Sequence, residues 1–184
     1  MLRKHFIRPI TSIKDQDKKI IFMNIKELGE THGGFYKEIL EAVTGKSRKK
    51  IGEVFLEYKE RFLKYGDYCS QLPKATHYLD TLISKDDCVA EEVAKCEKTA
   101  GKFKLVDLLT VPMQRILKYH MLLQRLVQQT TNIHEEYHSI QQAYDCMLDV
   151  SEYINEVKRD SEQLELIRAI QTSITDWNIQ VCLF

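Results

Sequence analysis

The chain has 184 residues, of which 43% are hydrophobic, so it is long enough to bury one well-formed core. Its 27 basic and 27 acidic side chains cancel, which excludes an overall electrostatic attraction to nucleic acid or to anionic lipid. No apolar run approaches the roughly 20 residues that cross a bilayer, so stable membrane insertion is not expected. The amino terminus lacks the apolar block of a signal peptide. The five cysteines are scattered and form no C-x-x-C pair, which favours reduced thiols in a cytoplasmic protein.

Long helices are the predicted secondary structure, because seven glycines and three prolines leave long uninterrupted stretches and none of these alternates apolar with polar residues. Gly33-Gly34 predicts a break, Gly66 and Pro73 predict bends, and KSRKK at 46–50 predicts a basic turn. The predicted fold class is an elongated all-α bundle, with an irregular tail at 178–184. The predicted helices, in chain order, are residues 2–7, 15–28, 35–43, 51–64, 67–84, 86–100, 105–130 and 135–173.

The stretch VPMQRILKYHMLLQRL, residues 111–126, has two faces when residues are stepped at 100° around a helix. Gln114, Lys118 and Arg125 lie opposite the apolar face, with Leu122 beside them. An apolar residue among amides and cations, with no acid from 111 to 127, is typical of a protein-binding surface. An ordinary solvated face is the alternative interpretation. The apolar face, expected in the core, consists of Met113, Ile116, Leu117, His120, Leu123 and Val127.

The last predicted helix also has a buried and an exposed side. Apolar residues recur every seven positions at 140, 147 and 154, and again at 143, 150, 157 and 164, which predicts a seam between packed helices. Asn155, Lys158 and Arg159 lie off this seam in INEVKRDSEQ. Folding does not require an asparagine on a helix surface, so Asn155 is a candidate for a functional role. Chance is an equally good explanation of its presence there.

Two short motifs resemble catalytic signatures, and neither has the required context. HEEYH at 134–138 matches the H-E-x-x-H pattern of zinc peptidases, with Glu135 as the general base, but it lies at the polar start of a helix. TGKS at 44–47 resembles the end of a phosphate-binding loop, but Leu40 occupies the position of the first glycine. We therefore expect HEEYH to form a solvated first turn of a helix without a bound metal, and TGKS to form a simple turn.

The run DLLTVPMQRILKYHMLLQRLVQQT resembles the third conserved region of Dbl-homology domains, the guanine nucleotide exchange factors of Rho-family GTPases. INEVKRDSEQ resembles the end of that family's last long helix. Most members have proline where His120 stands. The KYH variant, with YKERFLKYGDYCSQ, is similar to the Vav branch of the family. The resemblance covers about residues 3–177 and implies a Dbl-homology (RhoGEF) domain at 1–177.

This resemblance implies that the bundle grips the two switch segments of a Rac/Rho-type GTPase and favours its nucleotide-free form. Lys118 and Asn155 are expected to contact the second switch, with Leu108 and Gln114 along the same surface. Leu122, Lys158 and Arg159 are further candidates. Such a mechanism uses no cofactor, metal, general acid or nucleophile, so no catalytic residue is assigned. The alternative is a non-catalytic helical module that binds a GTPase without accelerating release.

The chain departs from the family at its start, where a full first helix with a glutamate for the first switch is expected to end near HFIRPI. Without that part we expect low stability and slow exchange, because four or five buried apolar side chains at about 1.5–3 kcal/mol each are missing. The membrane-recruiting and regulatory modules of Vav-like proteins are also expected to lie outside this chain.

Overall fold

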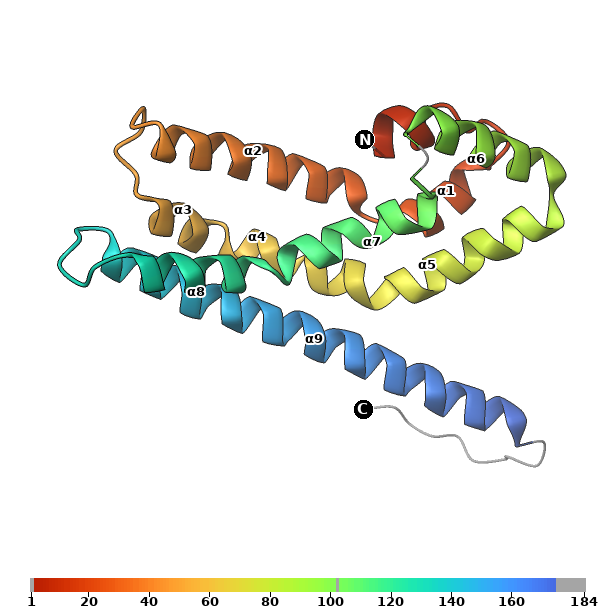
Figure 1. Cartoon of the computed structure of the whole chain (residues 1–184). Helices are drawn as coiled ribbons and strands as arrows, with labels where there is room; N and C mark the ends of the chain where they lie inside the picture. The colour runs from red at the N-terminus through yellow and green to blue at the C-terminus, as the bar shows by residue number, and fades with distance from the viewer. Residues whose placement is uncertain (1, 102, 175–184) are drawn as a thin grey trace.

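The computed structural model describes residues 2–101 and 103–174, and every regular element in these ranges is helical, which confirms the all-α prediction. Figure 1 shows an elongated arrangement in which α9 runs along one side of the molecule. A short π-helical turn, η1 (Arg3–Ile7), comes first. The helices that follow are α1 (Asp15–Phe22), α2 (Ile25–Val43), α3 (Ile51–Glu57), α4 (Lys59–Leu63), α5 (Tyr65–Lys85), α6 (Asp87–Thr99), α7 (Leu105–Ile116), α8 (Tyr119–Gln129) and α9 (Tyr137–Ser173).

Helix α9 is the longest helix described and packs along α8, α5 and α3 (Figure 1). The predicted seam is confirmed over its first half, where Ile140, Met147 and Ile154 are buried. It ends after the half-buried Val157, because Leu164 is 42% exposed. The last part of α9 therefore extends past the bundle and contacts it through few side chains, among them Glu165, which pairs with Lys74 at 2.7 Å.

Two glycines lie where helices approach α9 closely, and at Gly52 the approach leaves no room for a side chain. A Cβ atom at Gly52 in α3 would lie 2.2 Å from the carbonyl oxygen of Ser139. At Gly66 in α5, a Cβ atom would lie 3.0 Å from the ring of Tyr153. The bend predicted at Gly66 is displaced, since the chain turns at Lys64, between α4 and α5, and α5 then runs through Gly66 and Pro73. Gly66 instead serves the close packing of α5 on α9.

The predicted break at Gly33-Gly34 is also wrong, because α2 is continuous from 25 to 43. A Cβ atom at Gly34 would lie 2.7 Å from the hydroxyl oxygen of Tyr58, so this glycine makes room for a side chain that donates to Glu38. The break falls earlier, at Met23, whose φ of 47° ends α1. The helix ends predicted at 44–45 and at 101 are confirmed, and Gly45 and Gly101 both have positive φ.

The predicted continuous helix at 105–130 is wrong in one respect that bears on function. It is divided into α7 and α8 by a turn at Leu117 and Lys118. The Lys118 N–H donates to the carbonyl oxygen of Arg115 at 3.2 Å, a contact one residue shorter than an α-helical hydrogen bond. The α-helix is therefore interrupted at Lys118, the first residue of the KYH segment.

The segment between η1 and α1 is held to α6 by one carboxylate. Glu92 accepts hydrogen bonds from the backbone N–H and the hydroxyl of both Thr11 and Ser12, at 2.7–2.9 Å. Ile10 and Ile13 on either side are buried. The predicted tail at 178–184 lies outside the described residues.

Candidate functional site

The exposed side of α7 and α8 matches the face predicted from helical periodicity. Gln114, Lys118, Leu122 and Arg125 are all exposed, and we call these four residues the α7–α8 ridge. On the opposite side, Ile116 and Leu123 are buried and Met113, Leu117 and Val127 pack against the core. Leu122 is 51% exposed. Leu122 is thus an aliphatic side chain exposed to water between two cations. Covering it with a partner would lower the free energy of the system and so favour binding.

Helix α9 borders this ridge through a contact between His120 and Ser151. The His120 Nδ1 lies 3.1 Å from the Ser151 hydroxyl, which itself donates to the carbonyl oxygen of Met147. His120 is thus a hydrogen-bonded residue at the α8–α9 interface, as the sequence predicts. Asn155 lies one helical turn beyond Ser151 and is exposed. Helices α8 and α9 are antiparallel neighbours (Figure 1), and His120 meets Ser151, so residues that follow Ser151 along α9 lie toward the start of α8.

The two further cations predicted on α9 are engaged in exposed ion pairs within that helix. Arg159 donates to Glu156 at 3.0 Å, and Lys158 lies 3.5 Å from Glu162. Pairs of this kind contribute about 0.2–0.5 kcal/mol, so a partner with acidic groups can displace them at little cost.

Leu108 differs from the other predicted contact residues. It is only 8% exposed and faces a cavity on another side of α7, away from the α7–α8 ridge. The structure therefore does not bring Leu108 together with Gln114 and Lys118 on one exposed surface. The reason is the helical phase, since six residues at about 100° each fall about 120° short of two full turns and so place positions 108 and 114 on different faces of the helix.

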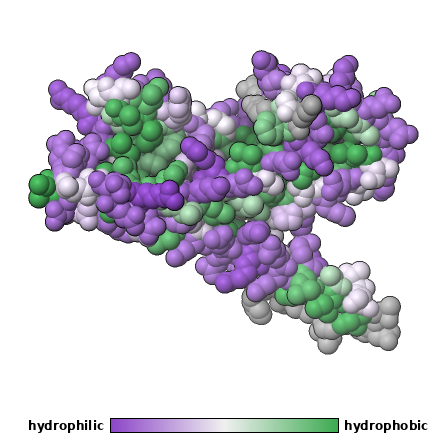
Figure 2. Space-filling view, viewed as in Figure 1, coloured by the Kyte–Doolittle hydropathy of each residue, from purple (hydrophilic) through white to green (hydrophobic). Residues whose placement is uncertain are grey.

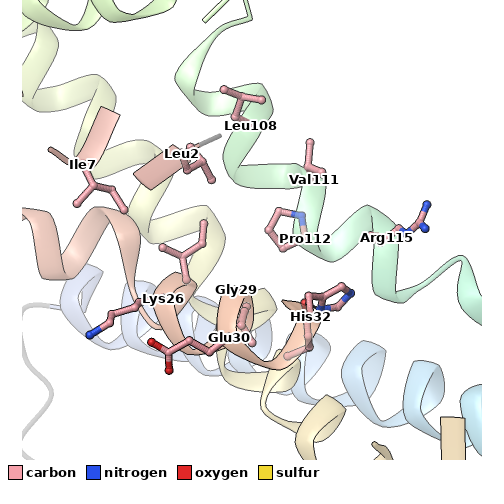
Figure 3. Close-up of a pocket in the computed structure, with 13 residues that line it drawn as sticks. Leu2, Ile7, Lys26, Gly29, Glu30, His32, Leu108, Val111, Pro112 and Arg115 are labelled. Atoms are coloured by element: carbon pink, nitrogen blue, oxygen red, sulfur yellow. Dashed lines mark hydrogen bonds between the residues drawn. The ribbon is translucent and has the colours of Figure 1, made fainter. Parts of the chain in front are cut away.

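The cavity beside Leu108 has a volume of about 600 Å³ and lies between η1, α2 and α7 (Figure 3). Polar groups stand among its apolar walls, and His32 and Arg115 lie at the same end. Figure 2 shows apolar residues gathered in the recess between the upper two lobes, and a separate apolar patch over the projecting part of α9. The apolar lining of the cavity includes Leu2, Ile7, Ile25, Leu28, Leu108, Val111 and Pro112.

A hydrogen-bonded group that sequence patterns did not predict connects the ridge to the core. The guanidinium of Arg115 lies 5.3 Å from the ring centre of Tyr119, and its Nε is 3.4 Å from the Tyr119 hydroxyl oxygen. That hydroxyl lies 2.8 Å from His32 Nε2, and the Tyr65 hydroxyl lies 2.7 Å from His32 Nδ1. Burial, and then the charge of Arg115, lower the pKa of His32, so the imidazole is neutral at physiological pH.

The two motifs that resemble catalytic signatures are not arranged as active sites. His134 and Glu135 lie in the turn before α9, so the two imidazoles of HEEYH do not share a helix face. Within 2–101 and 103–174, no group of three metal-ligating side chains is assembled. TGKS follows the end of α2 as a turn, as expected. Among the helices described, none is long and apolar enough to span a bilayer.

The RhoGEF domain model matches residues 1–155. The chain belongs to the RhoGEF domain family. Protein vav of Drosophila melanogaster is 43% identical over 178 residues, which cover 95% of this chain and 22% of that protein. The human guanine nucleotide exchange factor VAV3 is 40% identical over 186 residues, covering 100% of this chain and 22% of VAV3. The RhoGEF domain thus spans about a fifth of the length of these curated relatives.

The fold agrees with this assignment. The apo structure of the activated truncation of Vav1 superposes on this RhoGEF domain with a TM-score of 0.89 and 42% sequence identity, covering 98% of this chain and 47% of that one. The resemblance to the Vav branch predicted from KYH and YKERFLKYGDYCSQ is therefore confirmed.

Proposed function

We propose that this RhoGEF domain is a guanine nucleotide exchange factor for Rho/Rac-family small GTPases. The observation that carries the proposal is an exposed ridge of amides, cations and one leucine beside Asn155, on a chain that belongs to this family. The relative VAV3 is named as a guanine nucleotide exchange factor, which supports the same activity here.

In the proposed mechanism, the α7–α8 ridge and the adjoining side of α9 bind the switch regions of the GTPase. Lys118 and Asn155 contact the second switch, Gln114 and Leu122 extend that contact, and Lys158 and Arg159 lie at its edge. Binding favours the nucleotide-free GTPase, so by linkage bound nucleotide weakens the complex to the same extent. A thousandfold faster GDP release requires only about 4 kcal/mol less activation free energy, which a few interfacial contacts can supply.

The chemistry of the buried thiols fits a function based on binding. Burial raises the pKa of Cys69 to about 12, and burial also raises the pKa of Cys96 and Cys146, so these three thiols remain protonated at neutral pH. The proposed exchange reaction breaks no covalent bond, and its rate depends on the geometry of the ridge.

The test is the release of fluorescently labelled GDP from Rac, followed by stopped flow with the RhoGEF domain in excess. Lys118→Ala and Asn155→Ala should each slow release about tenfold or more, the usual effect of removing a central contact. Lys98→Ala on α6 and Asn132→Ala in the loop before α9 are matched controls at exposed positions and should change nothing. Equal effects of all four variants would contradict the proposed site, and binding without acceleration would favour the non-catalytic module.

The same preparation tests the expectation of low stability and slow exchange. A robust thermal transition together with GDP release at the full rate of a larger Vav-type exchange domain would contradict it.

A further inference from the structure

Tyr119 stands at the point where the α7–α8 ridge meets the core. It is the first residue of α8, directly follows Lys118, and is 4% exposed. Its ring packs against Phe35 and Phe55, with ring centres 5.6 Å away in each case. The backbone of Lys118 is therefore attached to a side chain that is fixed in the core.

The hydroxyl of Tyr119 has two polar partners. The Nε of Arg115 can only donate, so the Tyr119 oxygen accepts from it. The neutral His32 ring lies between two tyrosines, with Nε2 bonded to the Tyr119 hydroxyl and Nδ1 bonded to the Tyr65 hydroxyl. The hydrogen-bonded chain therefore runs from Arg115 through Tyr119 and His32 to Tyr65, and it connects α7, α8, α2 and α5.

Helix α7 packs on α5 and α8 packs on α9, and this chain of hydrogen bonds adds a direct connection between the two sides of the turn. The turn between them contains one short backbone contact, from Lys118 N–H to the Arg115 oxygen. A side chain that is bonded to Arg115 before the turn and to His32 on a third helix determines how α8 leaves that turn.

We propose that Tyr119 is a positioning residue, which fixes the turn that presents Lys118 through its hydrogen bonds to His32 and Arg115. The inference rests on the proposed function, because it concerns the presentation of Lys118 to the GTPase. Tyr119 itself is buried and does not contact the partner.

The experiment compares Tyr119→Phe with Tyr65→Phe. Each removes one hydroxyl from His32 and keeps its ring, and the two tyrosines are 4% and 2% exposed, so the structural losses are matched. Only Tyr119 adjoins Lys118. Both variants should lower the thermal midpoint similarly, while Tyr119→Phe slows GDP release about three- to tenfold and Tyr65→Phe changes it by less than about twofold. Rates are measured well below the lower of the two midpoints, so that both chains are folded.

A double-mutant cycle separates positioning from a general loss of structure. If Tyr119 acts through Lys118, Tyr119→Phe should cause no further slowing in a Lys118→Ala background. Independent, multiplicative slowing would overturn the proposal, and so would equal effects of Tyr119→Phe and Tyr65→Phe on release. If Tyr119→Phe does not fold, His32→Gln replaces it, because this variant removes the imidazole and leaves Tyr119 in place. Multiplicative slowing with Lys118→Ala, or an effect on release equal to that of Tyr65→Phe, would again overturn the proposal.

The controls also distinguish this inference from the proposed function. If the unmodified domain in excess does not accelerate GDP release, the proposed function itself fails. If the unmodified domain accelerates release and Lys118→Ala slows it about tenfold while leaving measurable acceleration, exchange at this site stands, and the tyrosine comparison and the double-mutant cycle decide the positioning role.

Discussion

Replacing Gly52 by alanine tests the close approach of α3 to α9. The added Cβ atom would lie 2.2 Å from the Ser139 carbonyl oxygen, 2.3 Å from its carbonyl carbon and 2.8 Å from the Ile140 nitrogen. All three atoms belong to the backbone of α9 or its immediate start, so no flexible side chain can move aside. Helices α3 and α9 must therefore separate by about 1 Å, and this loosens the packing of Val54 and Phe55 beside the contact.

The expected cost follows from two opposing terms. Forcing extra volume into a packed interface costs about 1–3 kcal/mol, and backbone contacts place this substitution at the upper end. Alanine in a helix regains about 0.5–1 kcal/mol relative to glycine. Gly52→Ala should therefore lower the free energy of unfolding by about 2 kcal/mol, which corresponds to a thermal midpoint about 4–8 °C lower for a domain of this size.

Gly33→Ala is the matched control, because Gly33 also lies within a helix and has no heavy atom within 4 Å of an added Cβ atom. The same substitution should raise stability there by about 0.5–1 kcal/mol. Urea unfolding followed by circular dichroism measures both variants. A Gly52→Ala chain as stable as the parent would refute the close approach of α3 to α9.

Three further predictions concern single polar contacts. Glu92 has a pKa lowered from 4.5 to about 2, chiefly by its hydrogen bonds from Ser12, so its contribution to stability should be present above pH 4.5 and lost as the pH falls toward 2. Glu92→Gln should be less stable than the parent at neutral pH, and the difference between their thermal midpoints should shrink on acidification. The lowered pKa of His32 means that stability should decline as the pH falls below 6.5, and an NMR titration should find the midpoint of this imidazole below 6.5. Tyr68→Phe removes a 2.6 Å hydrogen bond to the Leu109 carbonyl oxygen and should cost about 1 kcal/mol in urea unfolding, whereas an unchanged midpoint would exclude that bond.

The fold class and the helix ends that depend on local chemistry could be predicted from the sequence. Gly45 and Gly101 end helices with positive φ, as their positions indicated. Gly34 and Gly66 misled the prediction, because a glycine that admits a side chain from a distant helix looks the same in sequence as one that breaks a helix. The turn at Lys118 was missed for a related reason, since nothing within residues 105–130 distinguishes a continuous helix from two helices held at an angle by the core.

For the candidate site, helical periodicity alone separated Gln114 and Lys118 from the core. Leu108 was placed on the same surface through the family resemblance, and the structure puts it in a cavity wall instead. The bond between His32 and Tyr119 could not be predicted, because 87 positions separate them in the chain and neither belongs to a motif that implies the other.

The projecting end of α9 has a consequence for any study that alters its length. Leu166, Ile167 and Ile170 are exposed there, on the side away from Glu165 and its partner Lys74. The helix is continuous for 37 residues, about 55 Å. The number of residues between the packed part of α9 and this apolar patch therefore fixes the direction in which the patch faces. One residue inserted after Val157 would rotate the patch by about 100° and advance it by about 1.5 Å, and two inserted residues would turn it to nearly the opposite side.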